Sequence, residues 1–194
     1  MHLLEYCKSI DLRLFLLING AHTAFLDPLM AWVSGKLFWI PLYIVVAYVL
    51  IRCYRMKSIS IFIAMALCIA FSDQAASHLI KPLVHRLRPC HNPALINMIH
   101  LVSGCGGKYG FVSSHAANAF AIATFLSVVL ESSCKWLKYI LFIVAVTVSY
   151  SRIYLGVHYP ADVVVAALLG GLIGYVLGKL YQKWSYEGQG NHGR

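Results

Sequence analysis

Charged residues are scarce in this 194-residue chain, of which 12% are charged and 60% hydrophobic. That balance excludes an ordinary soluble domain, in which about a quarter of the residues are charged. Acidic residues are the scarcest, with 7 Asp and Glu against 16 Lys and Arg. The Cys and His residues show no Cys-x2-Cys pair of the kind that binds zinc. The sequence therefore predicts no metal site and no cofactor.

Apolar runs long enough to cross a bilayer dominate what remains, because about 20 helical residues match the hydrocarbon core. Four runs cover residues 58–80, 114–130, 139–157 and 160–178. A fifth, residues 37–51, is short, but Lys36 and Arg52 can extend it by reaching the two interfaces. We expect an all-α fold, a polytopic membrane helix bundle of five or six transmembrane helices with N-terminal interfacial amphipathic helices.

The first 35 residues are interrupted by polar side chains, namely Asp11, Arg13, Asn19, His22 and Asp27. This pattern favours two amphipathic segments in the interface, residues 3–18 and 24–33, over a sixth span through residues 15–33. The expected organisation is an N-terminal segment (1–35), a membrane domain (36–184) and a polar cytoplasmic tail (185–194). No cleavable signal peptide is expected, because Glu5 lies in the would-be basic region.

Basic residues divide between the two sides of the predicted bundle. One side carries the cations of three short segments: Arg52, Arg55, Lys57, Lys135, Lys138, Lys179 and Lys183. The positive-inside rule makes that side cytoplasmic. The other side also holds cations, in clusters with histidines and hydroxyls, and an anionic ligand explains them better than headgroup binding does. We expect no nucleic-acid partner, although the net charge is +9.

Two polar clusters adjoin the ends of apolar runs on this second side. Lys81 and Arg88 follow the run of residues 58–80, in which Asp73 and Ser77 share a helical face with Lys81. Ser113 precedes the run of residues 114–130 as a candidate N-cap. The free amides of Ser113, Ser114 and His115 should then form an anion cradle at a helix N-terminus. Taken alone, each cluster is also explained by a helix anchor or a simple cap.

A third cluster links the last two apolar runs. Ser151 and Arg152 close the run of residues 139–157, where an unpaired guanidinium is costly. His158 and Asp162 lie four residues apart, across Pro160 at a first helical turn. Asp162 can accept the Nδ1 proton of His158 and leave Nε2 as a nucleophile. Alone, the pair is also explained as a helix cap.

In this order, Lys81-x6-Arg88-Pro89, Ser113-x-His115 and Ser151-Arg152-x5-His158-x3-Asp162 resemble the tripartite signature of the type 2 phosphatidic acid phosphatase superfamily. The resemblance covers about residues 37–180. The second block departs from the usual Pro-Ser-Gly-His, because Val112 and Ser114 replace Pro and Gly. The extra side chain of Ser114 lies beside the expected phosphate.

The resemblance implies a role for each matching residue. His158 would be the nucleophile that forms a phosphohistidine, Asp162 would orient it, and His115 would protonate the leaving oxygen. The phosphate would be held by Lys81, Arg88, Ser113, Ser114 and Arg152. It implies a multi-pass protein of the bacterial cytoplasmic (inner) membrane, with the active site on the periplasmic face.

The function expected from the site is metal-independent removal of phosphate from a lipid that enters from the bilayer. The compact size and the outward site resemble bacterial members of the superfamily that act on undecaprenyl diphosphate, which is the substrate we expect. Lipid A and phosphatidylglycerophosphate phosphatases share the same three blocks and stay as alternatives, as does a phosphotransferase. A bis-histidine haem protein is a distant alternative, because His115 and His158 lie at span ends rather than at matched depths.

Two further patterns concern structure. Cys90 and Cys105 lie in the long outer loop, and an oxidising compartment would allow a disulfide between them. The alternative is two free thiols. Gly170, Gly174 and Gly178 form a small-residue stripe, which favours close helix packing inside the bundle over a homodimer interface.

Overall fold

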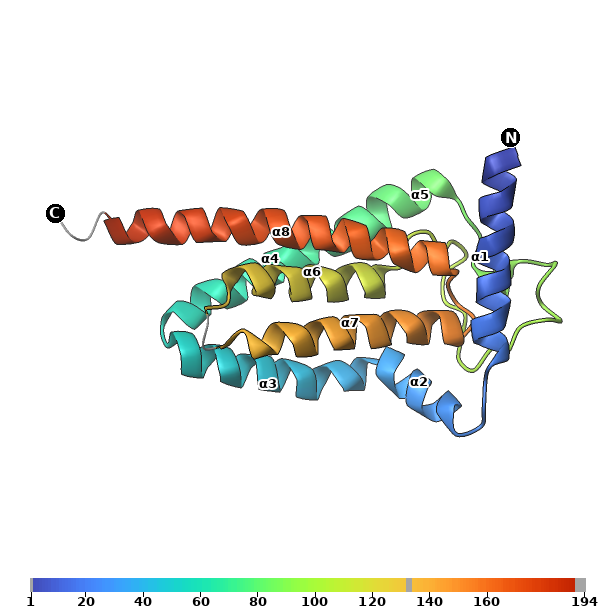
Figure 1. Cartoon of the computed structure of the whole chain (residues 1–194), viewed down its shortest axis with the longest axis horizontal. Coiled ribbons are helices and arrows are strands. Elements are labelled where there is room, and N and C mark those ends of the chain that lie inside the picture. Colours follow the sequence, from blue (N-terminus) through green and yellow to red (C-terminus); the bar gives the residue numbers. More distant parts are fainter. Residues whose placement is uncertain (1, 132–133, 191–194) are drawn as a thin grey trace.

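The computed structural model describes residues 2–131 and 134–190. Its helices are α1 (His2–Gly20), α2 (Leu26–Ser34), α3 (Lys36–Tyr54), α4 (Lys57–Gln74), α5 (Lys81–Val84), α6 (Ser114–Val129), α7 (Trp136–Tyr154) and α8 (Pro160–Gly190). Helices α3 to α8 run side by side as a bundle, and α1 lies across one end of it (Figure 1). The predicted all-α helix bundle is confirmed.

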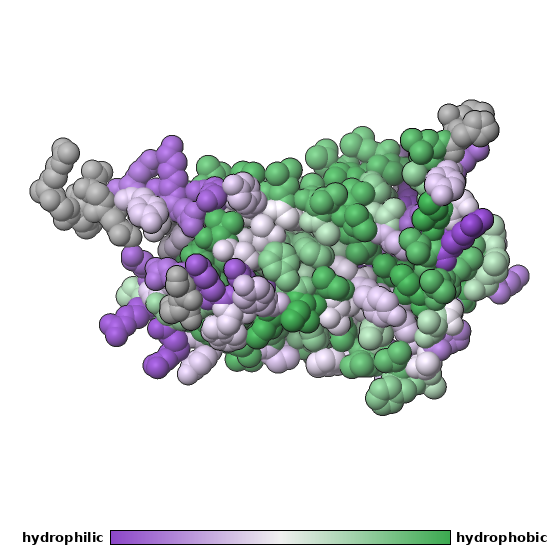
Figure 2. Space-filling view, viewed as in Figure 1, coloured by the Kyte–Doolittle hydropathy of each residue, from purple (hydrophilic) through white to green (hydrophobic). Residues whose placement is uncertain are grey.

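On the face that Figure 2 shows, apolar side chains cover the middle of the bundle and polar side chains gather mainly at the end away from α1. Within residues 2–131 and 134–190, four helical stretches are long and apolar enough to cross a membrane: Lys36–Tyr54, Lys57–Val84, Trp136–Tyr154 and Pro160–Glu187. Large apolar side chains such as Ile44, Ile63 and Leu168 are exposed on these stretches. In water such a surface would be a liability, whereas in a bilayer it faces lipid tails.

Helix α6 is the shorter apolar helix at the centre of the bundle, packed against α4, α7 and α8 (Figure 1). Its Ala117, Ala121 and Ala123 are fully buried, as are Phe125 and Leu126. Hydrophobic exclusion from water supplies little association energy inside a bilayer, so close packing must hold the helices together. The small side chains of α6 permit that close approach.

The glycine stripe of α8 makes the closest of these contacts. A Cβ atom at Gly170 would lie 2.0 Å from the carbonyl oxygen of Ala117, and one at Gly174 would lie 2.3 Å from that of Ala121. The backbones of α6 and α8 therefore touch at these positions. The prediction that the stripe packs inside the bundle is confirmed.

The N-terminal segment forms two helices, close to the predicted segments 3–18 and 24–33. Residues 21–25, between α1 and α2, are not helical. The alternative of one span through residues 15–33 is therefore wrong. Helix α1 has a buried face, with Phe15 fully buried and its ring 5.3 Å from that of Tyr159. Near the C-terminal end of α1, the side-chain amide of Asn19 donates hydrogen bonds to the carbonyl oxygens of His100 and Tyr154.

The predicted span 58–80 is one continuous helical stretch of α4, a π-helical turn (Ala75–Ile80) and α5. Pro82 lies within this stretch and does not end it, although a proline has no amide to donate inside a helix. The stretch ends at His85, whose φ of 51° is left-handed. The π-helical turn contains more residues per turn than an α-helix, so it changes the direction in which Ser77 and Lys81 project from the helix. Such turns are frequent at functional sites.

The outer loop, residues 86–112, folds back on itself. Leu87 and Tyr109 form an antiparallel bridge, and a disulfide joins Cys90 to Cys105. A second disulfide, not expected from the sequence, joins Cys53 to Cys134 at the other end of the bundle. Helix α8 continues through Gly190, so the first part of the predicted tail is helical. The rest of that tail, residues 191–194, lies outside the described residues.

Candidate active site

The predicted site residues gather at the end of the bundle that α1 covers. Lys81, His115, Arg88, Arg152 and His158 lie within electrostatic range of one another. They come from α5, the outer loop, the first turn of α6, the last turn of α7 and the residues before α8. Sequence-distant cations and imidazoles therefore share one small volume, as an anion site requires.

Lys81 and Ser114 are joined in a polar network between α5 and α6. The ammonium group of Lys81 donates to Ser114 Oγ at 3.2 Å, and Ser114 Oγ lies 2.8 Å from Ser77 Oγ. Asp73 extends the network, accepting hydrogen bonds from Ser77 and from the amide of Asn118 at 3.5 and 3.3 Å. The side chain of Ser114, unusual at this position, thus anchors the lysine.

Ser113 lies at the N-cap position of α6, with an extended backbone and no capping hydrogen bond from its side chain. Its amide donates to the carbonyl oxygen of Asp162 at 3.2 Å, so the prediction of a free Ser113 amide is wrong. The bond instead ties the start of α6 to the start of α8. The hydroxyl of Ser113 is buried without a partner among the described residues. Such a group costs about 1–3 kcal/mol unless a ligand satisfies it.

Arg88 is held by the fold of the outer loop. Its Nε donates to the carbonyl oxygen of Tyr109 at 3.2 Å, and Nη1 donates to that of Cys105 at 2.9 Å. Gly110 packs against it so closely that a Cβ there would lie 3.0 Å from the Arg88 side chain. Burial lowers the pKa of Arg88, and the nearby Asp162 opposes that shift. The disulfide at Cys105 therefore also fixes a carbonyl that orients this guanidinium.

Arg152 projects from the last turn of α7. Its Nη1 donates to Ser34 Oγ at the end of α2, while Nε is buried with no partner in the described part of the chain. No sequence motif pointed to Ser34 as a partner of Arg152. The remaining donors of the guanidinium are available to an anion, and a guanidinium fork matches phosphate oxygens.

His158 and Asp162 lie on either side of the start of α8. Nδ1 of His158 is 3.5 Å from Asp162 Oδ2, and both side chains are buried. Oδ2 also accepts the amide hydrogen of Tyr159 at 3.0 Å, the contact of a capping box. Burial lowers the pKa of His158 to about 4, with the nearby Arg152 and Arg88 adding to the shift and Asp162 opposing it. At neutral pH this imidazole is uncharged, as a nucleophile must be.

Arg86 binds the carboxylate of Asp162 and is itself paired with Asp11, and no role was predicted for either residue. Arg86 Nη1 donates to Asp162 Oδ1 at 2.7 Å, and Nη2 pairs with Asp11 of α1. Two signals were present in the sequence: a third cation between Lys81 and Arg88, and a carboxylate inside an apolar interfacial segment. Neither signal identifies the partner, because Asp11 and Arg86 are 75 residues apart.

A cavity of about 390 Å³ opens beside this cluster, between α3 and α4. Ser114, His115, Asp73 and Asn118 line its polar part. The rest is lined by Trp39, Ile40, Tyr43 and Ile69, with Lys36 at the start of α3. His115 is an exposed residue that lines this cavity. The cavity therefore has one polar and one apolar part, which suits an amphiphile.

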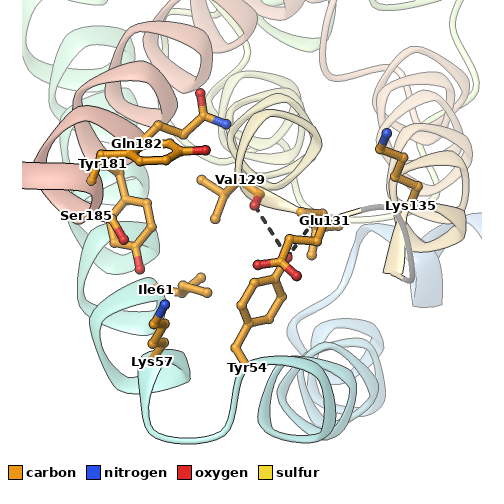
Figure 3. Close-up of a pocket in the computed structure, with 11 residues that line it drawn as sticks. Tyr54, Lys57, Ile61, Val129, Glu131, Lys135, Tyr181, Gln182 and Ser185 are labelled. Atoms are coloured by element: carbon orange, nitrogen blue, oxygen red, sulfur yellow. Dashed lines mark hydrogen bonds between the residues drawn. The ribbon is translucent and has the colours of Figure 1, made fainter. Parts of the chain in front are cut away.

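A larger cavity, of about 700 Å³, lies at the opposite end of the bundle (Figure 3). Tyr54, Lys57, Glu131 and Gln182 are among its lining residues, and none of the predicted site residues is. Size alone does not assign a site, and the convergence of imidazoles, cations and carboxylates places the chemistry at the α1 end. Among the residues that the structure describes, no three His, Cys, Asp or Glu side chains are grouped to hold a metal ion.

The family model for the PAP2 superfamily matches residues 58–186. The chain is 39% identical over 178 residues to a lipid A 4′-phosphatase of Bacteroides thetaiotaomicron, which covers 90% of this chain and 78% of that relative. It is 32% identical to an undecaprenyl-diphosphatase of Sulfolobus acidocaldarius, over 87% of this chain and 77% of that relative. The crystal structure of Aquifex aeolicus LpxE superposes with a TM-score of 0.62 at 30% identity, covering 88% of this chain and 95% of that one.

The helical fold and the grouped imidazoles and cations define a membrane-embedded phosphatase. The chain belongs to the PAP2 superfamily, and its relatives are phosphatases that act on lipids. It is accordingly a multi-pass membrane protein and a lipid phosphatase.

Proposed function

We propose that this protein removes the 4′-phosphate of lipid A, a phosphate monoester on a glucosamine-based lipid, through a phosphohistidine intermediate. The observation that carries the proposal is the cavity between α3 and α4, which joins an apolar wall to the polar cluster around Ser114 and His115. A substrate that reached this cavity sideways from the bilayer would keep its acyl chains in lipid.

The sequence-based choice of undecaprenyl diphosphate is replaced by the alternative, lipid A. The lipid A 4′-phosphatase relative is 39% identical over 90% of this chain, whereas the undecaprenyl-diphosphatase relative is 32% identical over 87%. The two substrates also differ in how much they need a general acid. A sugar alkoxide is a poor leaving group that needs protonation by an acid, while the leaving group of a diphosphate is itself a phosphate and needs it less.

In the proposed reaction, Nε2 of His158 attacks phosphorus in line with the bond to the sugar oxygen. The P–N bond forms as the P–O bond breaks, and His115, protonated once the anionic phosphate is bound, gives the departing oxygen its proton. Asp162 stabilises the positive charge that develops on His158. Water, with His115 now acting as base, then attacks the phosphohistidine and releases inorganic phosphate. The enzyme returns to its starting state with both imidazoles restored.

Electrostatic stabilisation falls to the groups that hold the phosphate. Lys81, Arg88 and Arg152 surround the site and would neutralise charge on the equatorial oxygens. The buried hydroxyl of Ser113 and the amide of Ser114 at the start of α6 would donate to them. We propose that no metal takes part, because the described carboxylates and histidines are not grouped as metal ligands.

We also propose that the site faces the periplasm of a bacterial inner membrane. The opposite end of the bundle carries the loop with Arg55 and Lys57, the start of α7 with Lys138 and the end of α8 with Lys183. The bias of basic residues toward the cytoplasm supports this orientation, under which the Cys53–Cys134 pair at the same end meets a reducing compartment, where disulfides are rare.

A panel of lipid phosphates tests the proposal on the detergent-purified protein. The panel contains lipid A labelled at the 4′-phosphate, lipid A labelled at the 1-phosphate, undecaprenyl diphosphate and phosphatidylglycerophosphate, each assayed with and without EDTA. We expect release of inorganic phosphate with the highest kcat/KM from the 4′ position, unchanged by EDTA. The matched control is His158→Ala, which should release none.

Preferred hydrolysis of undecaprenyl diphosphate or phosphatidylglycerophosphate would overturn the substrate assignment. Transfer of the label to a second lipid, without free phosphate, would make the protein a phosphotransferase. Loss of activity in EDTA that Mg²⁺ restores would overturn the metal-free mechanism.

A further inference from the structure

Asp11 is a buried carboxylate on a helix that otherwise lies at the edge of the fold. Its side chain is 7% exposed, although α1 crosses the end of the bundle (Figure 1). Oδ1 accepts the amide hydrogen of Ala161, in the first turn of α8, at 2.8 Å. Oδ2 pairs with Arg86. Burying a carboxylate is costly unless it is paired and hydrogen-bonded, and both conditions are met here.

Arg86 connects this carboxylate to the catalytic pair. One of its nitrogens contacts Asp11 and the other donates to Asp162 Oδ1 at 2.7 Å. The guanidinium lies over the ring of Tyr159, 4.1 Å from its centre, which fixes its plane. Oδ2 of Asp162 is left to face His158. Charges thus alternate along a chain from Asp11 through Arg86 and Asp162 to the imidazole.

Other contacts also attach α1 to the end of the bundle. Phe15 packs on Tyr159 at 5.3 Å, and Asn19 bonds to the carbonyl oxygens of His100 and Tyr154. An apolar side chain at position 11 would be the usual choice for a further contact. Asp11 is instead aimed at an arginine whose other partner is the carboxylate beside His158.

We propose that Asp11 and Arg86 are positioning residues for phosphoryl transfer, which together set the orientation and the effective charge of Asp162 and, through it, the protonation of His158. The inference rests on the proposed function, since it assigns roles within the same reaction. It makes α1 part of the active site, although none of the three sequence blocks lies in it.

The two residues act on His158 with opposite sign. Arg86 offsets the charge of Asp162, so that the imidazole is not protonated too readily. Asp11 partly neutralises the positive charge of Arg86. Asp162 therefore keeps enough negative charge to stabilise the imidazolium that forms during attack. The other charged or titratable groups around Arg86, Asp162 and His158 are Arg152 of α7, Arg88 of the outer loop, Lys81 of α5, His115 of α6 and Tyr159 before α8.

The test measures kcat, kcat/KM against pH, and the melting temperature for four variants in detergent. Asp11→Asn keeps an oxygen for the Ala161 amide but removes the charge. Arg86→Gln removes the cation, and Arg86→Lys keeps it without the two-pronged geometry. Glu5→Gln is the matched control, because Glu5 is an exposed acid on the same helix.

We expect Arg86→Gln to lower kcat by roughly 10- to 100-fold, the usual cost of misplacing a reacting group. In its profile of kcat/KM against pH, the fall on the acid side (the acid limb) should move to higher pH. Without the cation, Asp162 favours protonated His158 and so raises the pH at which the nucleophile becomes protonated. Arg86→Lys should return the limb toward the wild-type position. Asp11→Asn should lower kcat without moving the limb upward, and Glu5→Gln should match wild type.

An Arg86→Gln protein with an unmoved acid limb would overturn the proposal, whether its kcat is unchanged or falls only with its melting temperature. Wild-type kcat in Asp11→Asn would overturn the part assigned to Asp11. These outcomes differ from failure of the proposed function itself, in which wild-type protein would release no phosphate from any lipid of the panel.

Discussion

His158 Nδ1 lies 3.5 Å from Asp162 Oδ2 within a buried pair that bridges the loop after α7 and the first turn of α8. The separation is long for a hydrogen bond, and such bonds often tighten only when substrate is bound. Because Oδ2 also accepts the Tyr159 amide hydrogen and Oδ1 the Arg86 guanidinium, the carboxylate has little freedom to turn. A hydrogen bond that formed between His158 Nδ1 and Asp162 Oδ2 on substrate binding would select the tautomer with a free Nε2.

Asp162→Asn should lower kcat by about 10³- to 10⁴-fold, because an amide cannot select that tautomer or stabilise the imidazolium. KM should change little, since Asp162 does not contact the phosphate. Initial rates of phosphate release measure both values. Glu131→Gln, at the far end of the bundle, is the control. A loss of less than tenfold would show that Asp162 serves the helix start alone.

The buried imidazole should also make the stability of the protein depend on pH. The pKa of His158 is about 4 in the folded protein, lowered by burial, against about 6.5 in an unfolded chain. Between these values the unfolded chain binds the proton and the folded protein does not, so stability falls as pH drops from 6.5 to 4. Titration of His158 changes the free energy of unfolding by at most ~1.4 kcal/mol per pH unit, and this dependence on pH vanishes above pH 6.5.

Melting temperatures from pH 4 to 7.5 check this, with His158→Gln compared to wild type. The variant should lose less stability on acidification. His78→Gln, which removes an exposed histidine, should follow wild type. Parallel curves for His158→Gln and wild type would mean that the imidazole titrates normally.

Gly170→Ala should destabilise the bundle severely, by about 3 kcal/mol or more, because overpacking a close contact forces the backbones apart. The added Cβ would meet the carbonyl oxygen of Ala117 at 2.0 Å. Gly171→Ala is the matched control on the next residue, where the nearest atom is Thr124 Oγ1 at 3.7 Å. Thermal unfolding in detergent distinguishes them. Equal melting temperatures would contradict the packing of α8 on α6.

Breaking the Cys90–Cys105 bond should lower stability and weaken substrate binding. The bond spans 15 residues, for which the chain-entropy model gives about 3 kcal/mol. Its loss also loosens the Cys105 carbonyl that orients Arg88. The Cys90→Ser/Cys105→Ser protein should therefore melt at lower temperature and show a raised KM. Alkylation of both thiols in wild type without reductant would refute the bond.

The Cys53→Ser/Cys134→Ser protein provides the comparison, since it removes the disulfide at the other end of the bundle. Its melting temperature should fall while KM stays at the wild-type value. A similar rise of KM in both double variants would assign the effect to general loosening rather than to Arg88.

The spans and the three motif blocks could be predicted because their signals are local. Hydropathy over ~20 residues marks a membrane helix, and short spacings bring Lys81, Ser113 and His158 to span ends. The Asp11–Arg86 pair could not be predicted, because it depends on how α1 crosses the bundle. The free amide expected at Ser113 was wrong for a similar reason, since its acceptor is contributed by α8.

The choice of lipid was also beyond the sequence motifs. The blocks hold phosphate, which all candidate substrates share, whereas the headgroup would contact the cavity between α3 and α4. Trp39 and Tyr43 of that cavity lie outside the blocks. Only the comparison with relatives moved the preference from undecaprenyl diphosphate to lipid A.

Trapping the covalent intermediate tests the central claim most directly. Protein would be mixed with lipid A carrying ³²P at the 4′-phosphate, quenched in alkali within milliseconds to seconds, and digested with trypsin. We expect an acid-labile, alkali-stable label on His158, in the peptide of residues 153–179, that forms and decays at rates compatible with kcat. His158→Ala should acquire none. Full turnover with no labelled protein at any time, or a label on another residue, would contradict nucleophilic attack by His158.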